Sequence, residues 1–228
     1  HSQFYCFISI ITSHYLLLFP MLGLNTLFKK KKVIYTANFG DYDNQQKDAD
    51  KIFNENNNIF DGCAEHLSPR LMAKLYKVLN SLDYDIWVDS NVEILDRKGF
   101  EKLFSGDLCV FKHPFNKTIR DEINACKDAG YVNDKQIKNI EQLYKSGGLS
   151  VDTTPVYACG IIYRTSKAKE FNRLWWELIC MYSYRDQLTF PFALSNFPEL
   201  DFKTIDINIY NMDGVINPYF LFHPHNAK

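Results

Sequence analysis

The chain has 228 residues, a formal net charge of −1 at neutral pH and a sequence pI of about 6.6. A chain of this length can bury the core of one large α/β domain. Its near-neutral charge gives no electrostatic basis for binding nucleic acid or an anionic membrane surface, so any recognition of phosphate must be local. The six cysteines form no Cys-x-x-Cys pair and no Cys/His cluster, which argues against a structural zinc site.

The amino-terminal segment, residues 4–28, is largely apolar and is followed by four consecutive lysines. It is long enough to span a bilayer, although polar residues, Pro20 and Gly23 interrupt it. Lysines on its carboxyl side would keep the rest of the chain in the cytoplasm. Two interpretations stay open: a membrane anchor, or an over-extended reading frame in which Met21 is the true start. We expect residues 1–31 to stand apart from one domain, residues 32–228, located in the cytoplasm or at a membrane.

The first predicted strand spans residues 32–38, which are rich in β-branched and aromatic side chains, and a Gly/Asp turn follows it. Many nucleotide-binding domains begin this way, as do many other α/β domains. Residues 44–58 are polar and rich in asparagine, which predicts a surface loop or a short polar helix.

A helix is predicted to begin at Ser68, an N-cap residue, with Pro69 at its first position. Leucine and valine then recur at helical spacing and form its apolar face. Arg70, Lys74 and Lys77 fall three or four residues apart and form one cationic stripe on another face. The stripe is either a solvated basic face or a clamp for a diphosphate, and its place directly before the next strand gives weight to the clamp.

The next predicted strand, residues 86–88, ends in Asp89, and a short polar turn with Asn91 follows. Open α/β sheets bind their ligands at the carboxyl ends of strands. Carboxylate and amide oxygens suit a Mg²⁺ or Mn²⁺ ion that carries a phosphate. The alternative is that Asp89 only caps the turn.

Four further elements are predicted: a helix over residues 97–104, a strand over residues 107–112, mostly helical structure over residues 118–144 and a buried strand over residues 156–163. His113 directly follows the second of these elements and is either a substrate contact or a loop residue without a role. Gly160 lies inside the buried strand, where glycine indicates the close approach of a ligand or of another backbone.

The last predicted helix carries an aromatic and leucine stripe within residues 171–182, which is typical of a core-facing helix. Arg185 and Asp186 follow this helix and either pair with each other or face a polar substrate. Near the end of the chain, His223 and His225 flank a proline. One of them is a candidate metal ligand, and an unstructured terminus is the alternative.

Five segments, in this order, resemble a glycosyltransferase-like family catalogued as domain of unknown function 616, which includes plant proteins of pectin and mucilage synthesis. They are YTANFGDYD (35–43), SPRLMAKLYKVL (68–79), YDIWVDSNVEI (84–94), VFKHP (110–114) and FNRLWWELICMYSYRDQLTF (171–190). The resemblance covers residues 33–190. It implies a single GT-A-like, Rossmann-like α/β domain, with a mixed, mostly parallel sheet flanked by helices, that binds a nucleotide-sugar and a divalent cation.

The resemblance also implies roles for single residues. GT-A enzymes hold the metal with an Asp-x-Asp motif at a strand end, and Asp89-Ser90-Asn91 is similar to it, with an amide in the second acidic position. The implied ligands of Mn²⁺ or Mg²⁺ are Asp89, Asn91, His223 and His225. The implied donor-binding residues are Tyr35, Thr36, Ala37, Arg70, Lys74, Lys77, Gly160 and Gln187. The implied catalytic residues are Arg185 and Asp186, and the implied acceptor contact is His113.

These assignments predict a metal-dependent glycosyltransferase that moves a sugar from a nucleotide-diphosphate donor, with a UDP-sugar favoured, to a hydroxyl of a glycan or polysaccharide. Asp186 would orient the acceptor or the donor sugar, or serve as a base in an inverting reaction. The alternative is a non-catalytic relative that binds a nucleotide-sugar or glycan, which Asn91 favours. A metal-dependent phosphohydrolase or nuclease would need a denser set of carboxylates or a basic surface, and the sequence suggests neither.

Overall fold

The computed structural model describes residues 31–40, 43, 48–60, 67–79, 84–209 and 217–225. The apolar segment over residues 4–28 lies outside this part of the chain, so the choice between anchor and over-extended frame stays a prediction. Within the described part, every helix is too short or too polar to cross a membrane.

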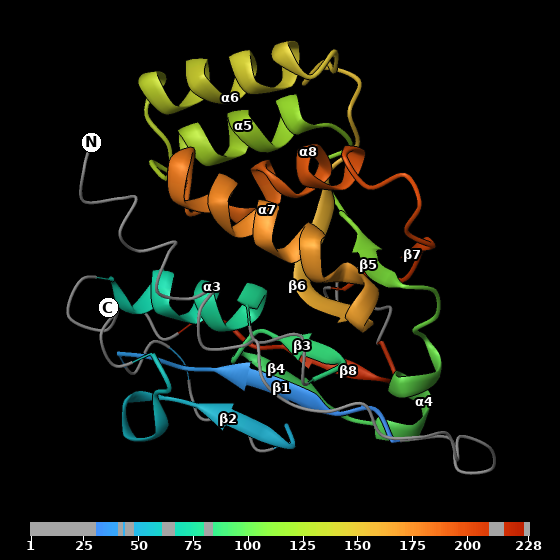
Figure 1. The fold of residues 1–228 in the computed structure, drawn as a ribbon. Helices are drawn as coiled ribbons and strands as arrows, with labels where there is room; N and C mark the ends of the chain where they lie inside the picture. Colours follow the sequence, from blue (N-terminus) through green and yellow to red (C-terminus); the bar gives the residue numbers. More distant parts are fainter. Residues whose placement is uncertain are drawn as a thin grey trace, which may run out of the picture. The chain divides into compact units, whose positions relative to one another are not determined.

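A six-stranded sheet forms the centre of the fold, in the order β2-β1-β3-β6-β5-β7 (Figure 1). Its strands are β1 (Ile34–Ala37), β2 (Lys51–Phe53), β3 (Ile86–Val88), β5 (Leu108–Lys112), β6 (Tyr157–Arg164) and β7 (Phe202–Ile205). Strand β6 runs antiparallel to both β3 and β5, and the other neighbouring pairs are parallel. The predicted α/β class with a mixed, mostly parallel, Rossmann-like sheet is confirmed.

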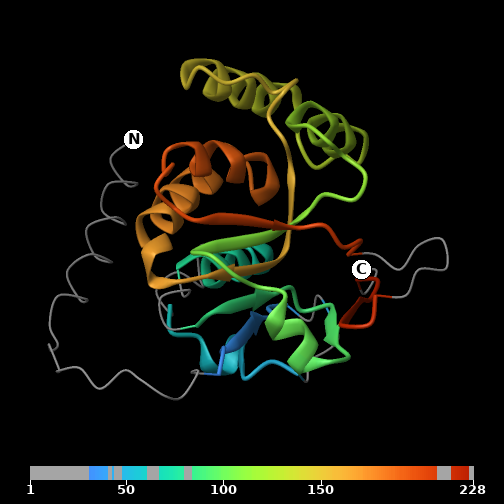
Figure 2. The same cartoon turned by 90° about the vertical axis from the view of Figure 1, so that its right-hand side faces the viewer.

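One face of the sheet packs against helices α3 (Pro69–Leu79), α7 (Lys169–Met181) and α8 (Phe190–Ser195) (Figures 1 and 2). Successive residues of a strand point to opposite faces. Trp87 of β3 therefore belongs to this helix-covered core, whereas its neighbours Ile86 and Val88 belong to the core on the other face. That second core is closed by helix α4 (Arg97–Lys102) and by a two-stranded antiparallel sheet of β4 (Val92–Ile94) and β8 (Phe220–Phe222).

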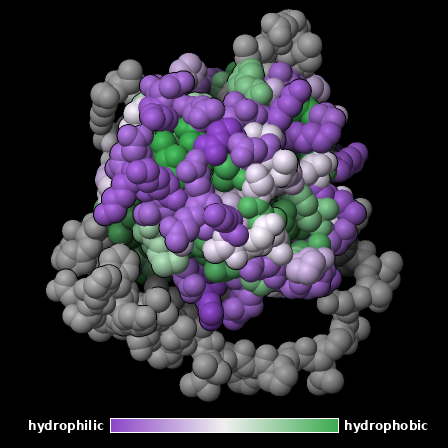
Figure 3. Space-filling view, turned by 90° about the horizontal axis from the view of Figure 1, so that it is seen from above, coloured by the Kyte–Doolittle hydropathy of each residue, from purple (hydrophilic) through white to green (hydrophobic). Residues whose placement is uncertain are grey.

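Helices α5 (Ile119–Asp128) and α6 (Asp134–Ser146) enclose a third, smaller core. Each begins with a capping box, set by Thr118 and Asn133 respectively. Both views show this pair beyond α7, on the side away from the sheet (Figures 1 and 2). Seen from that side, the surface is mostly hydrophilic with small apolar patches between the polar side chains (Figure 3).

Two predictions of local structure can be compared directly with the structure. Helix α3 starts as predicted, because the hydroxyl of Ser68 accepts a hydrogen bond from the backbone N–H of Leu71 at 3.3 Å. The loop or short helix predicted over residues 44–58 instead contains strand β2, followed by a 3₁₀ turn η1 (Glu55–Asn57). Strand β2 lies at the sheet edge and buries only Phe53, so its sequence need not be apolar.

Candidate active site at the carboxyl edge of the sheet

Strands β1, β3, β5 and β7 run in the same direction, so their carboxyl ends meet at one edge of the sheet, where β6 begins. A cavity of about 470 Å³ opens there. Ten of the predicted site residues line it: Lys74, Lys77, Asp89, Asn91, Gly160, Arg185, Asp186, Gln187, His223 and His225. The fold thus brings together residues that lie up to 151 positions apart in the sequence, from Lys74 to His225.

A second cavity of about 170 Å³ adjoins the first at the end of β1. Ala37 and Arg70, two further predicted donor-binding residues, line it. The two cavities share four lining residues, which are Lys74, Asp89, Arg185 and His225. Two of these four, Lys74 and Arg185, are cations, and Asp89 is a carboxylate.

The described lining of the two cavities does not include Tyr35, Thr36 or His113. Tyr35 and Thr36 are fully buried in β1. The Tyr35 hydroxyl donates to the backbone carbonyl of Lys77 at 3.0 Å and accepts from the guanidinium of Arg164 at 2.7 Å. Tyr35 therefore holds the carboxyl-terminal part of helix α3 against strand β1. His113 accepts the backbone N–H of Asn116 at 2.9 Å through its Nδ1.

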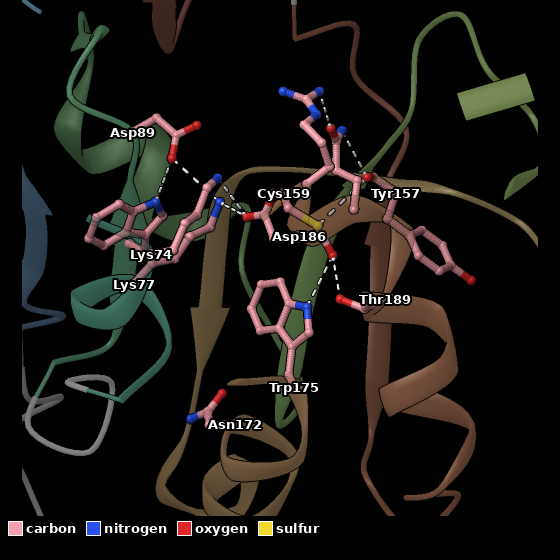
Figure 4. A network of polar contacts seen from close by, with 12 residues as sticks. Lys74, Lys77, Asp89, Tyr157, Cys159, Asn172, Trp175, Asp186 and Thr189 are labelled. Atoms are coloured by element: carbon pink, nitrogen blue, oxygen red, sulfur yellow. Dashed lines mark hydrogen bonds and ion pairs between the residues drawn. The ribbon is translucent and has the colours of Figure 1, made fainter. Parts of the chain in front are cut away.

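Asp89 directly follows β3. One of its carboxylate oxygens is hydrogen-bonded, and the other faces the cavity (Figure 4). Its Oδ1 accepts the indole N–H of Trp87 at 2.7 Å and lies 3.5 Å from the ammonium of Lys77. Its Oδ2 has no hydrogen-bond donor among the described residues and lies beside Gly160. The backbone N–H of Asp89 donates to the carbonyl of Gly160 at 2.7 Å, which fixes the strand end.

Asn91 supplies a second unengaged oxygen. Its amide nitrogen donates to the backbone carbonyl of His223 at 2.7 Å. A carbonyl can only accept a hydrogen bond, so this contact sets the orientation of the amide. The amide Oδ1 is buried and has no partner in the described part of the chain. A buried acceptor without a donor is costly unless a ligand supplies one or a cation binds it.

The two histidines of the tail pair with carboxylates. His223 Nε2 lies 2.7 Å from Glu93 Oε2, and His225 Nδ1 lies 2.7 Å from Asp43 Oδ1. The described residues contain no cluster of three or more His, Cys, Asp or Glu side chains arranged for a metal. Among the described residues, Asp89 Oδ2 and Asn91 Oδ1 are therefore the candidate ligands for a cation. Such a pair suits Mg²⁺ or Mn²⁺, whose coordination is completed by substrate phosphates and water.

Lys74 and Lys77 reach from α3 to one carboxylate oxygen of Asp186, which lies in the 3₁₀ turn η4 (Asp186–Leu188) (Figure 4). The two nitrogens lie 2.8 Å and 2.6 Å from Asp186 Oδ2. The side chain of Lys77 is 1% exposed and that of Asp186 is 5% exposed, whereas Lys74 is 22% exposed at the cavity. Two members of the predicted cationic stripe, Lys74 and Lys77, are thus turned into the site, whereas Arg70 is exposed.

The pKa values follow from this pairing. Burial raises the pKa of Asp186, but the two neighbouring lysines outweigh it and hold the pKa well below its usual range. Burial lowers the pKa of Lys77, but Asp186 and Asp89 outweigh it, and the pKa is raised. For Lys74, burial is the stronger effect, and its pKa is lowered although Asp186 opposes the change.

Arg185 is the third cation that lines the larger cavity, and it contacts Glu122 of α5. Its Nη2 lies 3.4 Å from Glu122 Oε1 and 3.2 Å from Gln187 Oε1. Its guanidinium lies 4.9 Å from the ring centre of Tyr131. The buried Nε of Arg185 has no acceptor among the described residues.

Sequence reasoning missed several contributors to the site, among them Trp87, Glu122, Asp43 and Phe222. Trp87 offers a signal, because it lies two residues before Asp89 on the same strand and therefore on the same face. Glu122 offers none, since it lies 63 residues before Arg185 and is identified only by the contact between them. Phe222 packs over Gly160, within 3.0 Å of where a β-carbon would lie, which accounts for the glycine in β6.

Comparison with known proteins identifies the family of the chain. The chain has no significant match among curated proteins or among solved structures. A family model described as TOD1/MUCI70, glycosyltransferase-like domain, matches residues 65–214, a span that contains helix α3, Asp89, Asn91 and the Arg185-Asp186-Gln187 segment. This is the family formerly catalogued as domain of unknown function 616, so the resemblance seen in the sequence is confirmed. The chain belongs to the TOD1/MUCI70 family of glycosyltransferase-like domains.

Proposed function

We propose that the chain is a divalent-cation-dependent glycosyltransferase that moves a sugar from a nucleotide-diphosphate donor to a hydroxyl group of a glycan or polysaccharide. The observation that carries this proposal is the wall shared by the two cavities, which contains the cations Lys74 and Arg185 together with the carboxylate of Asp89. The glycosyltransferase-like family supports sugar substrates in general.

The two cavities suit the two ends of such a donor. The smaller one lies at the end of β1, where Rossmann-like sheets bind nucleosides, and takes the nucleoside. The larger one takes the sugar and the acceptor, beside Gly160 and Gln187. The diphosphate joins the two ends and therefore lies along the shared wall, within reach of Lys74 and Arg185. A UDP-sugar remains the favoured donor from the sequence resemblance.

The charges of the site leave room for a divalent cation. The cations Lys74, Lys77 and Arg185 are paired with the carboxylates Asp186, Asp89 and Glu122, so the side chains alone are close to neutral. A nucleotide-diphosphate sugar is a dianion, and bringing it into a neutral, partly buried site is costly without a compensating charge. Mn²⁺ or Mg²⁺ held by Asp89 Oδ2 and Asn91 Oδ1 would supply that charge. The ion would also act as a Lewis acid toward the leaving diphosphate.

In this proposal, the three cations that line the larger cavity stabilise the leaving group. Lys74, Lys77 and Arg185 are fixed by their carboxylate partners before the donor arrives, so they stabilise the growing charge of the leaving diphosphate without first having to reorganise. Phe222 and the residues that follow it, His223 to His225, form part of the lining of the larger cavity.

A binding protein without turnover is the second function that a specific observation favours. Asn91 places an amide where an Asp-x-Asp motif has a carboxylate, and an amide oxygen is the weaker metal ligand. Binding of a nucleotide-sugar that is independent of Mn²⁺, with no product detected by mass spectrometry, would support this function instead.

The test is release of nucleoside diphosphate from a panel of nucleotide-sugars, with and without a glycan acceptor and with and without Mn²⁺. We expect Mn²⁺-dependent release by the wild-type chain and a loss of at least about a hundredfold in Asp89→Ala. Asp201→Ala, an exposed aspartate at the opposite end of the sheet, is the matched control and should retain full activity. Full activity in Asp89→Ala would remove Asp89 and its cation from the mechanism.

A further inference from the structure

The carboxylate of Asp186 lies in the candidate active site, and two lysines lie beside it at the cavity. Lys74 and Lys77 both bond its Oδ2, at 2.8 Å and 2.6 Å. Its backbone is equally constrained, because its carbonyl accepts the indole N–H of Trp175 at 3.1 Å and the hydroxyl of Thr189 at 3.3 Å (Figure 4). Asp186 is therefore a fixed point of the site: α3 contacts its carboxylate, and Trp175 and Thr189 contact its backbone carbonyl.

This arrangement is poorly suited to a general base. A base must hold the proton that it takes from the acceptor hydroxyl. Two ammonium groups contact Oδ2 of Asp186 in a side chain that is 5% exposed, and they lower the proton affinity of the whole carboxylate. The same contacts have a different consequence for the lysines: two like charges that would repel each other are held side by side by the carboxylate between them.

We propose, resting on the transferase function above, that Asp186 is a positioning residue: it holds the ammonium groups of Lys74 and Lys77 together on the donor diphosphate and does not accept the proton of the acceptor hydroxyl. Lys77 also contacts Asp89 at 3.5 Å, so the same network connects Asp186 to the cation-binding carboxylate. Asp186 thereby fixes the positions of both lysines before the donor binds.

The two roles of Asp186, base or positioning residue, predict different results for the binding of UDP in the absence of an acceptor. UDP binding requires no proton transfer, so Asp186→Asn should leave the affinity for UDP unchanged if Asp186 is only a base. If Asp186 positions the lysines, their mutual repulsion in Asp186→Asn displaces at least one of them, and we expect the affinity for UDP with Mg²⁺ to fall by about tenfold. Isothermal titration calorimetry measures this directly, with Asp201→Asn as the control that should bind as the wild type does.

A double-mutant cycle sharpens the test. In a Lys74→Met background the repulsion is already absent, so Asp186→Asn should cost less UDP affinity there than in the wild type. Additive effects of the two substitutions would contradict the positioning role, as would an Asp186→Asn chain that binds UDP as tightly as the wild type. A wild-type chain that binds no nucleoside diphosphate would instead reject the proposed function and, with it, this assignment.

A second measurement avoids the risk that Asp186→Asn does not fold. In the wild-type chain, the side-chain NMR signals at Cε of Lys74 and Lys77 should both shift when UDP and Mg²⁺ are added, since both ammonium groups face the diphosphate. Lysine Cε signals that do not respond to saturating UDP would overturn the proposal.

Discussion

Substituting Gly160 by alanine tests how closely the carboxylate of Asp89, the proposed cation ligand, and Phe222 of β8 approach Gly160. The added β-carbon would lie 3.0 Å from two ring carbons of Phe222 and 3.3 Å from Asp89 Oδ2. Both separations are shorter than ordinary van der Waals contact, so the ring and the carboxylate must each move by a few tenths of an ångström. Phe222 is only half-buried and can shift. We therefore expect a stability loss of about 1 kcal/mol, at the low end of the cost of overpacking.

The effect of Gly160→Ala on binding should exceed its effect on stability. A loss of about 1 kcal/mol lowers the melting temperature by only about 2–4 °C in a chain of this size. Displacement of Asp89 Oδ2, however, acts directly on the proposed cation position, and we expect the affinity for UDP in the presence of Mn²⁺ to fall by about tenfold or more. Calorimetric titration and thermal unfolding measure the two quantities separately.

The double variant Gly160→Ala/Phe222→Leu separates the two contacts. Shortening Phe222 relieves the clash with the ring, so stability should return toward that of Phe222→Leu alone, whereas the contact with Asp89 persists and the affinity should stay low. A Gly160→Ala chain that is as stable as the wild type and binds UDP with Mn²⁺ equally well would refute this reasoning.

Three further predictions concern the charged network. Lys77→Met should lower the free energy of unfolding by about 3 kcal/mol in a urea titration, because the buried Asp186 keeps only Lys74 as a partner; a loss below about 1 kcal/mol, as for an exposed pair, would contradict the burial of this contact. The stability of the wild-type chain should decrease as the pH falls below about 4, because the folded-state pKa of Asp186 lies below its unfolded value, and this dependence should weaken in Asp186→Asn. Asn91→Asp should tighten Mn²⁺ binding in the presence of UDP, measured by calorimetry, and unchanged Mn²⁺ binding would exclude position 91 as a ligand.

Most of the fold could be predicted from the sequence because its central elements carry strong local signals. Strand β3 is a short apolar run that ends in a polar turn, and α3 has a serine N-cap, a proline at its first position and an apolar stripe. Strand β2 has no such signal, since an edge strand is fixed by pairing with β1 and buries a single side chain. The tail could be a disordered terminus from sequence alone, yet residues 220–222 pair with β4.

The site could be predicted only in part, for a related reason. The spacing of Lys74 and Lys77 places both on one side of a helix, and this follows from the sequence. Their common partner Asp186 lies 109 residues after Lys77, and no local pattern connects the two. Tyr35 illustrates the opposite case: its position at the start of a nucleotide-binding type of fold suggests a donor contact, whereas its hydroxyl bonds the backbone of Lys77 inside the core.

The central claim, that Asp89 and Asn91 hold a divalent cation against a donor diphosphate, is tested most directly by a Mn²⁺ titration followed by electron paramagnetic resonance. Because the proposed site supplies only the oxygens of Asp89 and Asn91 from the described residues, Mn²⁺ should bind weakly to the chain alone and tightly once UDP is present. Asp89→Ala should abolish the UDP-dependent binding. Equal binding of Mn²⁺ with UDP by the wild type and by Asp89→Ala would contradict the account.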